Sequence, residues 1–363
     1  MTRRHWITAS ALAAPVLQAQ DAPHKIGIIG LGSRSRAHLG ALTTMPEARV
    51  TALCDLDPAR MRNAKQQVGD AATYADYREL VRDRNVSLVV IVSPNYLHAE
   101  MAIAALKAGK DVLLEKPLGI SYREAQAILQ AAKQSGRTLA VCMQRRYMRQ
   151  DVEVQQAVDR GMLGAVRLVQ ITEMRGDWNP QTWKYPDASG KQTSWRLLRK
   201  TAGSTELEFS IHSLAHVCML VKSPMARVSA TGGVTFYKDR DTRDLSSLWC
   251  EFSSGARLSY SFSCYAPGAG GAMFSILGDR GTLRRERGQL VYQAHGGKPE
   301  TLPPANVSDD RAEVALYRDL FRDIRENRPS ALGPEFAMEP MKIAFACELS
   351  IAEGRVVTAR DFA

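Results

Sequence analysis

Short strand-like runs alternate with helix-like segments over residues 25–143, and this alternation constrains the fold more than any other feature. The runs at residues 26–29 and 88–92 are continuously apolar. A strand that is apolar on both faces belongs in a parallel sheet covered by helices on both sides. We expect strands at residues 26–29, 50–54, 72–74, 88–92, 111–114 and 138–143. Repeated βα units of this kind predict a right-handed, doubly wound Rossmann sheet.

The pattern changes after residue 147, where consecutive strand-like runs are separated by tight turns. They lie at residues 165–174, 225–235, 245–252, 256–265, 273–277, 281–285 and 289–293. Helices are expected near residues 151–160, 207–220, 310–327 and 339–353. This order predicts a large, mostly antiparallel sheet with helices packed on one face. The expected fold class is α/β, with a Rossmann domain over residues 23–146 and a second α/β domain, for substrate binding and oligomerisation, over 147–363.

The first 22 residues have the order of an export signal. Arg3 and Arg4 precede an Ala-rich, weakly apolar run at residues 9–17, and small and polar residues follow it. Paired arginines favour the twin-arginine route, which exports folded proteins and would make this protein periplasmic or secreted. The alternative is a disordered N-terminal tail. No later apolar run approaches the ~20 residues that a spanning helix needs, so we expect no membrane partner.

The net charge of +10 raises the question of nucleic-acid binding, but the basic residues are scattered among acidic ones. A nucleic-acid partner would need a basic stripe, so we expect none, and the positive field suits an anionic cofactor or substrate instead. The six cysteines form no C-x-x-C pair and sit in apolar runs. A protein folded before export forms its core in a reducing compartment, so we expect mostly free thiols.

A glycine-rich segment follows the first strand and opens a helix. Gly30, Gly32, Ser33, Arg34 and Ser35 match the dinucleotide-binding pattern, with serine in place of its third glycine. Asp55 ends the second strand, where a carboxylate accepts hydrogen bonds from ribose hydroxyls and repels a 2′-phosphate. NAD is therefore the expected cofactor, and the nearby arginines leave NADP as the alternative. The competing interpretation is a structural turn with Asp55 as a helix N-cap.

Two further loops follow strands of the predicted Rossmann sheet. One contains Ser93, Asn95 and His98, and the other contains Glu115 and Lys116. Loops at the carboxyl ends of parallel strands line the ligand crevice. A lysine there can orient a substrate hydroxyl and move its proton. The structural alternatives are a helix N-cap for Ser93 or Asn95 and a surface ion pair for Lys116.

Together these motifs resemble the Gfo/Idh/MocA oxidoreductase family, and the resemblance runs from residue 25 to the C-terminus. It implies a sugar- or polyol-oxidising enzyme with a nicotinamide cofactor, which Gly30, Gly32, Ser33, Arg34, Ser35, Asp55, Ser93, Asn95, His98 and Glu115 would bind. It also implies that Lys116 is the active-site lysine, before a proline bond that is often cis.

The second domain carries the remaining candidate residues. Trp195, Arg196, Glu208 and His212 resemble the tryptophan and Asp-x-x-x-His segments of the family, with Glu208 where aspartate is usual. Spacing by four on a helix places Glu208, His212 and His216 on one face. We therefore expect Lys116, His212 and Glu208 to be catalytic and no metal to be bound, although a metal site at Glu208, His212 and His216 and buried core roles for both histidines are the alternatives.

The substrate is expected between the two domains. The residues assigned to it are Lys116, Arg146, Tyr147, Trp195, Arg196 and His216. Aromatic residues at 178, 183 and 185 would suit stacking on sugar faces, ordinary packing or an oligomer contact equally well.

The expected function is hydride transfer between a sugar or polyol carbinol and NAD(P), in a chain that forms homo-oligomers. Free NAD is scarce outside the cytoplasm, so the second hypothesis is an NAD-dependent glycoside hydrolase that recycles a tightly held cofactor. The third hypothesis is a non-catalytic sugar-binding protein on the same scaffold, against which Lys116 and His212 argue.

Overall fold

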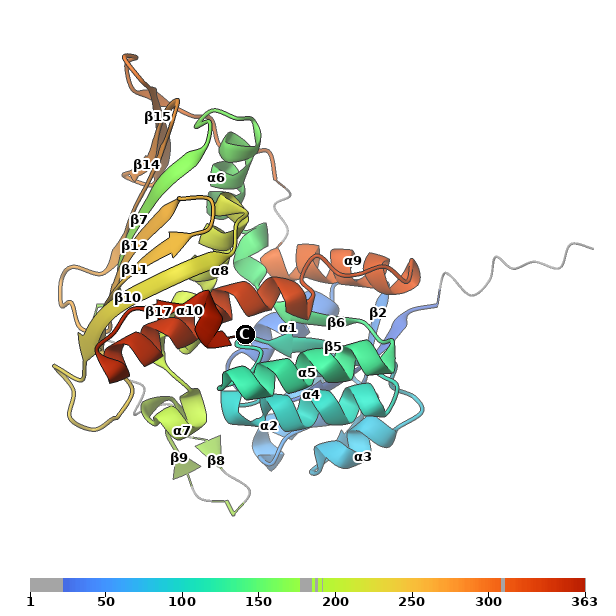
Figure 1. Cartoon of the computed structure of the whole chain (residues 1–363). Helices are drawn as coiled ribbons and strands as arrows, with labels where there is room; N and C mark the ends of the chain where they lie inside the picture. Colours follow the sequence, from blue (N-terminus) through green and yellow to red (C-terminus); the bar gives the residue numbers. More distant parts are fainter. Residues whose placement is uncertain (1–21, 177–184, 187–188, 191, 308–310, 363) are drawn as a thin grey trace, which may run out of the picture.

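The computed structural model contains two large sheets, one in each half of the chain (Figure 1). It describes residues 22–176, 185–186, 189–190, 192–307 and 311–362. The expected export signal at residues 1–21 and the aromatic residues Trp178 and Trp183 therefore lie outside the described residues, and of Tyr185 only the backbone is described.

The first sheet has six parallel strands in the order β3-β2-β1-β4-β5-β6. This confirms the predicted Rossmann sheet. Its strands are β1 (His24–Ile29), β2 (Ala48–Cys54), β3 (Ala72–Tyr74), β4 (Leu88–Ile91), β5 (Asp111–Glu115) and β6 (Leu139–Cys142). The helices between them are α1 (Ser35–Leu42), α2 (Pro58–Val68), α3 (Tyr77–Arg82), α4 (His98–Lys107) and α5 (Tyr122–Ser135), with a short 3-10 turn η2 (Asn95–Leu97) before α4.

The second sheet has nine strands in the order β16-β15-β14-β13-β7-β12-β11-β10-β17. They are β7 (Val166–Met174), β10 (Met225–Gly233), β11 (Leu245–Phe252), β12 (Arg257–Ser263), β13 (Gly271–Gly278), β14 (Gly281–Glu286), β15 (Gln289–Ala294), β16 (Glu300–Thr301) and β17 (Val357–Thr358). The predicted, mostly antiparallel sheet is confirmed. Only the described pair β7–β12 is parallel, because β7 enters the centre of the sheet between two strands that follow much later.

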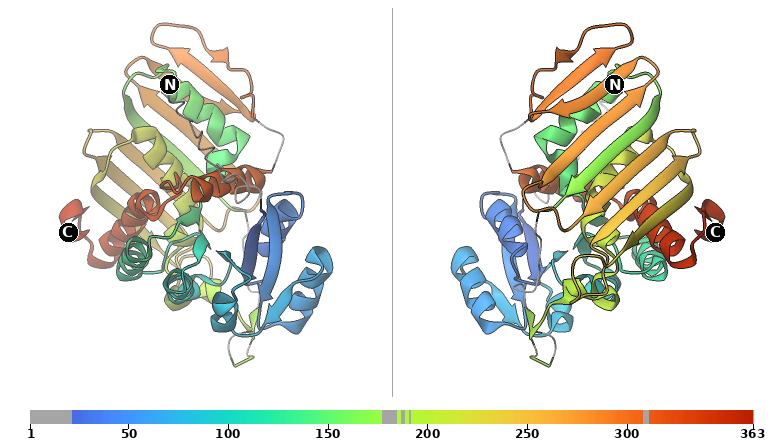
Figure 2. Two further views of the ribbon diagram at one scale, coloured as in Figure 1. Left: turned by 90° about the vertical axis from the view of Figure 1, so that its right-hand side faces the viewer. Right: turned by 90° about the vertical axis from the view of Figure 1, so that its left-hand side faces the viewer.

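Helices cover one face of this second sheet. They include α6 (Arg149–Asp159), α8 (Ile211–Val221) and α10 (Pro334–Glu353), of which α10 packs along β10. Figure 2 shows the opposite face without helices across it. The remaining elements are short strands, turns and one further long helix: η3 (Gln144–Tyr147), β8 (Tyr185–Pro186), β9 (Gln192–Thr193), η5 (Trp195–Leu197), α7 (Arg199–Ala202), the π-helical turn η6 (Glu206–Ser210), α9 (Ala312–Arg325) and η7 (Ala359–Phe362).

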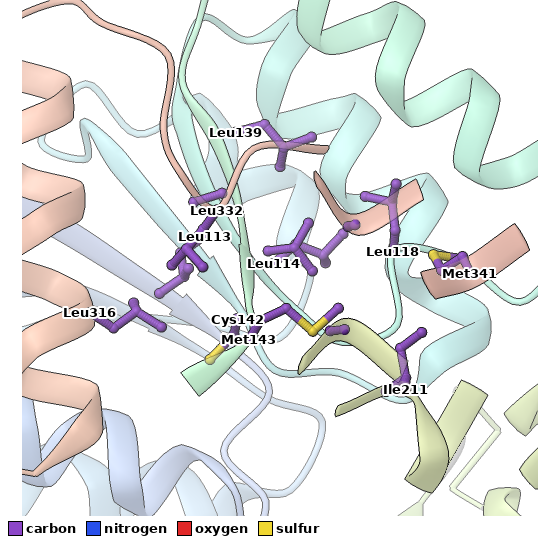
Figure 3. Packing of buried hydrophobic residues seen from close by; sticks show 14 of the residues in the cluster. Leu113, Leu114, Leu118, Leu139, Cys142, Met143, Ile211, Leu316, Leu332 and Met341 are labelled. Atoms are coloured by element: carbon purple, nitrogen blue, oxygen red, sulfur yellow. The ribbon is translucent and has the colours of Figure 1, made fainter. Parts of the chain in front are cut away.

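A shared apolar core joins the two domains. Figure 3 shows Leu114 of β5, Leu118 after β5 and Met143 after β6 beside Ile211 of α8 and Met341 of α10. All five side chains are buried. A backbone hydrogen bond of 2.8 Å from Val141 to the Leu332 carbonyl also ties the edge of the Rossmann sheet to the later chain. Because the site lies between the domains, this core fixes the relative position of its two halves.

All six cysteines are free thiols, and five of them are buried. Across the described part of the chain, no helix combines the length and the apolar character needed to cross a membrane.

Candidate active site

A cavity of about 880 Å³ runs along the carboxyl ends of β1, β2, β4 and β5 and reaches the second domain. The Rossmann domain contributes the glycine loop, Asp55, the Ser93–Leu97 loop and Lys116. Gln144 enters from the domain crossing, and the second domain adds Trp195, Arg196, Glu208 and His212. This is the position at which ligands bind in open parallel sheets.

The glycine loop has the geometry that a dinucleotide pyrophosphate requires. Gly30 has φ +90°, and a Cβ there would lie 2.7 Å from the backbone of Val92, so only glycine fits. The Leu31 N–H donates to a carboxylate oxygen of Asp55 at 2.6 Å, which holds the loop against the end of β2. Gly32 and Ser33 line the cavity where α1 begins, and Ser35 donates to the Gly32 carbonyl at 2.7 Å. These residues fit an NAD whose phosphates meet the N-terminus of α1 and whose ribose meets Asp55.

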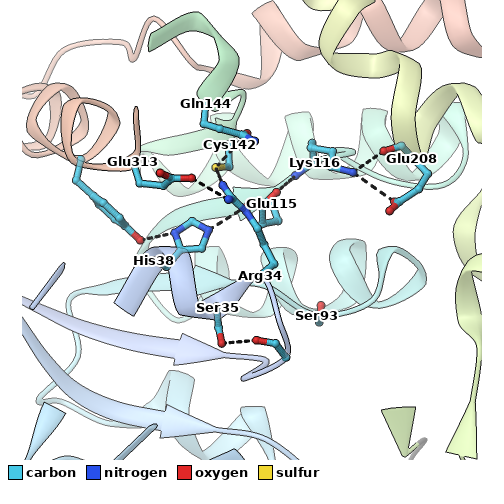
Figure 4. Close-up of polar contacts among 12 residues, drawn as sticks. Arg34, Ser35, His38, Ser93, Glu115, Lys116, Cys142, Gln144, Glu208 and Glu313 are labelled. Carbon is cyan, nitrogen blue, oxygen red and sulfur yellow. Dashed lines mark hydrogen bonds and ion pairs between the residues drawn. The ribbon is translucent and has the colours of Figure 1, made fainter. Parts of the chain in front are cut away.

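Arg34 lines this cavity, but its charge is already matched by two carboxylates (Figure 4). Its Nε donates to Glu115 at 2.5 Å and its Nη1 donates to Glu313 of α9 at 2.8 Å. Glu115 also lies 3.0 Å from Nε2 of His38, whose Nδ1 is 2.8 Å from the Tyr317 hydroxyl. Burial alone would raise the pKa of Glu115, but the hydrogen bond from His38 and the charge of Arg34 hold it well below its usual range.

The same network accounts for a cluster of metal-ligand side chains. One ligand atom each of His38, Glu115 and Cys142 lies within 4.8 Å of the others. The Arg34 guanidinium donates to Glu115 and approaches the Cys142 sulfur to 3.6 Å, so a positive charge already occupies the position of a cation. We interpret this cluster as a buried ion-pair network that ties the glycine loop to α9.

His98 holds two of the cavity loops from behind. Its ring is fully buried, with Nδ1 2.7 Å from the Pro117 carbonyl and Nε2 3.0 Å from the Ser93 carbonyl. Burial lowers the pKa of His98, which favours the neutral ring. His98 is not among the residues that line the cavity, and its two ring nitrogens contact the loops that do. The Lys116–Pro117 bond that it supports is cis.

Glu208 is the centre of the polar cluster at the domain interface. One carboxylate oxygen accepts from Nε of Arg196 at 2.6 Å. The other accepts from Asn95 at 3.1 Å and lies 3.4 Å from Nζ of Lys116, which also donates to the Glu208 carbonyl at 2.5 Å. Burial would raise the pKa of Glu208, but the charges of Lys116 and Arg196 lower it to about 2. Glu208 is therefore ionised at neutral pH and orients both cations.

His212 lies beside this cluster with one ring nitrogen buried. The pKa of His212 is lowered to about 3, first by burial and then by the charge of Lys116. The ring is therefore neutral at ordinary pH. Trp195 is buried under the Arg196 guanidinium, 4.3 Å from the ring centroid, and forms a wall of the same cavity.

Three residues that the sequence placed at the substrate lie elsewhere. Arg146 donates to the Ala331 carbonyl at 3.3 Å and Tyr147 donates to Asp319 at 2.9 Å, because the turn η3 directs both toward the helices of the second domain. His216 is one turn beyond His212 on α8, which carries it past the cavity to Asp151. None of these three residues is among those that line the cavity described above.

Gln144 is the residue of η3 that does line the cavity. It follows the carboxyl end of β6, just as Lys116 follows the carboxyl end of β5. Because such strand ends line the ligand crevice, the sequence could have indicated Gln144 as a site residue. The partners of Arg34 and Asn95 in the second domain had no comparable signal, because they lie 279 and 113 residues away in the chain.

Two family models match the chain. An oxidoreductase family model described as an NAD-binding Rossmann fold covers residues 24–143, and the GFO/IDH/MocA C-terminal domain covers residues 152–284. The protein therefore belongs to the Gfo/Idh/MocA oxidoreductase family, and its first domain is NAD-binding.

Individual relatives show how far the similarity extends. The chain is 40% identical over 143 residues to the inositol 2-dehydrogenase/D-chiro-inositol 3-dehydrogenase of Lactiplantibacillus plantarum, a match covering 39% of this chain and 41% of that protein. The chain thus spans less than half the length of the first curated relatives it matches. The myo-inositol 2-dehydrogenase of Thermotoga maritima is 24% identical over 92% of this chain and 98% of its own length.

A solved structure of levoglucosan dehydrogenase with NADH and levoglucosan shares the fold. It superposes with a TM-score of 0.81 at 22% identity, covering 93% of this chain and 99% of that one.

Asp55 is expected to set the preference for NAD over NADP. In the wild type, NADH should bind more tightly than NADPH, because the carboxylate repels a 2′-phosphate. Asp55→Ala should lose roughly tenfold or more in NADH affinity, since a hydrogen bond to a charged group contributes about 1.5–3 kcal/mol. Fluorescence titration with NADH and NADPH measures both affinities. Asp55→Asn is the control, because it removes the charge but keeps an oxygen for the Leu31 N–H. Equal wild-type affinities for the two cofactors would contradict this assignment.

Proposed function

We propose that this protein is an NAD-dependent dehydrogenase that oxidises a hydroxyl-bearing carbon of a sugar or polyol. One observation carries the proposal: Lys116, Glu208, Arg196 and His212 converge on the same cavity as the glycine loop and Asp55. A substrate between the domains would therefore meet a proton acceptor and two cations beside the expected cofactor.

Lys116 and His212 have different roles in the proposed reaction, which follow from their charges. A bound nicotinamide ring supplies the hydride acceptor. Lys116 is held in place by Glu208, so that it hydrogen-bonds the reacting oxygen and stabilises negative charge on it. His212 is neutral and accepts the hydroxyl proton.

The substrate class is supported by the chemistry of the cavity walls and by relatives. Gln144 and Arg196 offer donors for neighbouring hydroxyl groups, and Trp195 offers apolar surface. Relatives are named for myo-inositol, and a fold neighbour was solved with levoglucosan. We therefore place sugars and cyclic polyols first among substrates to be screened.

Lys116→Ala and His212→Ala are each expected to lower turnover by about 10²–10⁴-fold, the usual cost of removing a positioned proton-transfer group. Both variants should still bind NADH and keep the wild-type melting temperature within a few degrees. The measurement is NADH formation at 340 nm with myo-inositol, levoglucosan and related polyols. Lys107→Ala, on the exposed end of α4, is the control. Turnover that survives both substitutions would contradict the assigned roles.

We also propose that residues 1–22 form a twin-arginine export signal, on the support of Arg3-Arg4 and the Ala-rich run that follows. Replacing both arginines with lysine should trap an uncleaved, folded precursor in the cytoplasm, because this route depends on the arginine pair. Cell fractionation and mass spectrometry of the N-terminus measure the outcome. Normal processing of the Lys-Lys variant would exclude the twin-arginine route.

We further propose that the uncovered face of the second sheet mediates homo-oligomer formation. Trp249 of β11 is 44% exposed on a strand whose alternate residues are buried, and Met273 of β13 is 67% exposed. Exposed apolar side chains on a broad sheet face are typical of an interface. Trp249→Asp combined with Met273→Asp should shift the protein to a monomer in sedimentation velocity. Val356→Asp, at a site 48% exposed outside these strands, is the control. A wild-type monomer at micromolar concentration would refute the proposal.

A further inference from the structure

A small cavity lies behind His212, on the side away from the main cavity. We call it the rear cavity, and its lining is Met143, Arg145, Arg146, His212, Ala215, His216, Met219 and Phe336. His212 is the single described residue that lines both this cavity and the main one. About 10 Å³ is open to the centre of a water molecule, which is room for one. His212 therefore lies between the two spaces.

Two buried ring nitrogens around the rear cavity have no hydrogen-bond partner among the described residues. They are Nδ1 of His212 and Nε2 of His216. The two histidines are four residues apart on the regular helix α8, so their Cβ atoms are roughly 5–6 Å apart. Both rings line the same cavity. Buried polar atoms are almost always hydrogen-bonded, and a single water touching both rings would satisfy both nitrogens.

The other nitrogen of His216 is anchored to a carboxylate. Nδ1 of His216 lies 3.2 Å from Asp151, which also accepts from Nε and Nη2 of Arg145 at 2.8 and 3.0 Å. Burial would raise the pKa of Asp151, but the hydrogen bond and charge of His216, with those of Arg145, lower it to about 2. A permanent carboxylate here places the His216 proton on Nδ1. Nε2 is left as the acceptor that faces the rear cavity.

We propose that one water in the rear cavity links Nδ1 of His212 to Nε2 of His216, and that this path carries away the proton taken up at the active site. The proposal rests on the role of His212 given above. A relay is useful here because the His212 ring has a low proton affinity, so that transfer of the proton to another group is favoured over its retention. His216 and Asp151 would act through His212 and are positioning residues.

The proton balance of the relay is simple. As the substrate C–H electron pair leaves with its hydrogen as hydride, the hydroxyl proton passes to Nε2 of His212, the nitrogen on the main-cavity side. Nδ1 of His212 then gives its own proton to the water, and the water gives one to Nε2 of His216. The resulting imidazolium is stabilised by Asp151. Rotation of the His212 ring, or exchange with water while the main cavity is open, restores the starting tautomer.

The path also has an exit. The rear cavity shares Arg146, Met219 and Phe336 with a groove of about 550 Å³ on the outside of the second domain. Lys222, Glu335 and Glu339 line that groove and connect it to solvent. The proposed path would reach solvent across this border, where Arg146, Met219 and Phe336 separate the rear cavity from the groove.

The relay is tested on the NAD-loaded protein with ¹⁵N-labelled histidine. His216→Leu removes the second nitrogen acceptor, and His216→Gln keeps a hydrogen-bonding side chain that cannot accept and pass on a proton. We expect NMR to show at least a tenfold slower exchange of the His212 Nδ1 proton with solvent in both variants. NADH affinity and melting temperature should stay close to wild type in His216→Gln, which separates the relay from a packing role against Phe274. His295→Gln, at an exposed histidine on another element, should leave the exchange unchanged.

Two further measurements decide the proposal independently of one another. A crystal structure of the NAD complex at high resolution should show a water between the two rings. With a polyol that the wild type oxidises, His216→Gln should lower kcat by about tenfold at constant KM and increase the solvent deuterium isotope effect. Unchanged exchange in both His216 variants, or a rear cavity without a water, would overturn the relay. Failure of the wild type to oxidise any polyol would contradict the proposed function, while the exchange and crystallographic results would still decide the relay.

Discussion

The ionised carboxylate of Glu208 is the interaction on which the arrangement of the active site depends. It is buried between Lys116 of the Rossmann domain and Arg196 of the second domain, and it contacts both. A buried carboxylate without partners would be protonated or expelled. Glu208 can therefore stay buried and ionised only because Lys116 and Arg196 both contact it. A second ion-pair network joins the domains at the glycine loop, where Arg34 bridges Glu115 of β5 and Glu313 of α9. The two domains are thus joined by charge at the site and by the apolar core behind it.

Much of the fold could be predicted because local patterns determine it. The apolar runs of β1, β4 and β5 could belong only to a sheet covered on both faces, and the predicted strand at residues 245–252 matches β11 residue for residue. The parallel contact between β7 and β12 could not be predicted, because it depends on where β7 enters the sheet and not on its own sequence. The π-helical turn at Glu206–Ser210 has no periodic signature either, and the sequence indicated one continuous helix there.

The part of the site that could be predicted from the sequence is the set of residues at the carboxyl ends of the Rossmann strands. Gly30, Asp55 and Lys116 follow β1, β2 and β5, and the carboxyl ends of parallel strands meet at one edge. The side chains beyond the first sheet depend on local turns and on the direction of α8. For that reason His212 faces the cavity while His216 faces away from it, although both lie on one stripe of the helix. The sequence motif also did not indicate that His98 would join two loops, by contacting the Pro117 and Ser93 carbonyls.

The charge states at the site also bear on how it behaves with pH. The pKa of Glu208 lies below its ordinary value of 4.5, so its contribution to stability is complete above that value and is lost only as pH falls toward about 2. The pKa of His212 is likewise lowered, to about 3, so keeping the ring neutral costs no stability above its ordinary value of 6.5, and stability is lost as pH falls from 6.5 toward about 3. Between these limits and neutrality neither group changes charge in the folded protein. The Lys116–Glu208–Arg196 cluster therefore presents one fixed field to the substrate, and proton movement is left to His212 and the groups behind it.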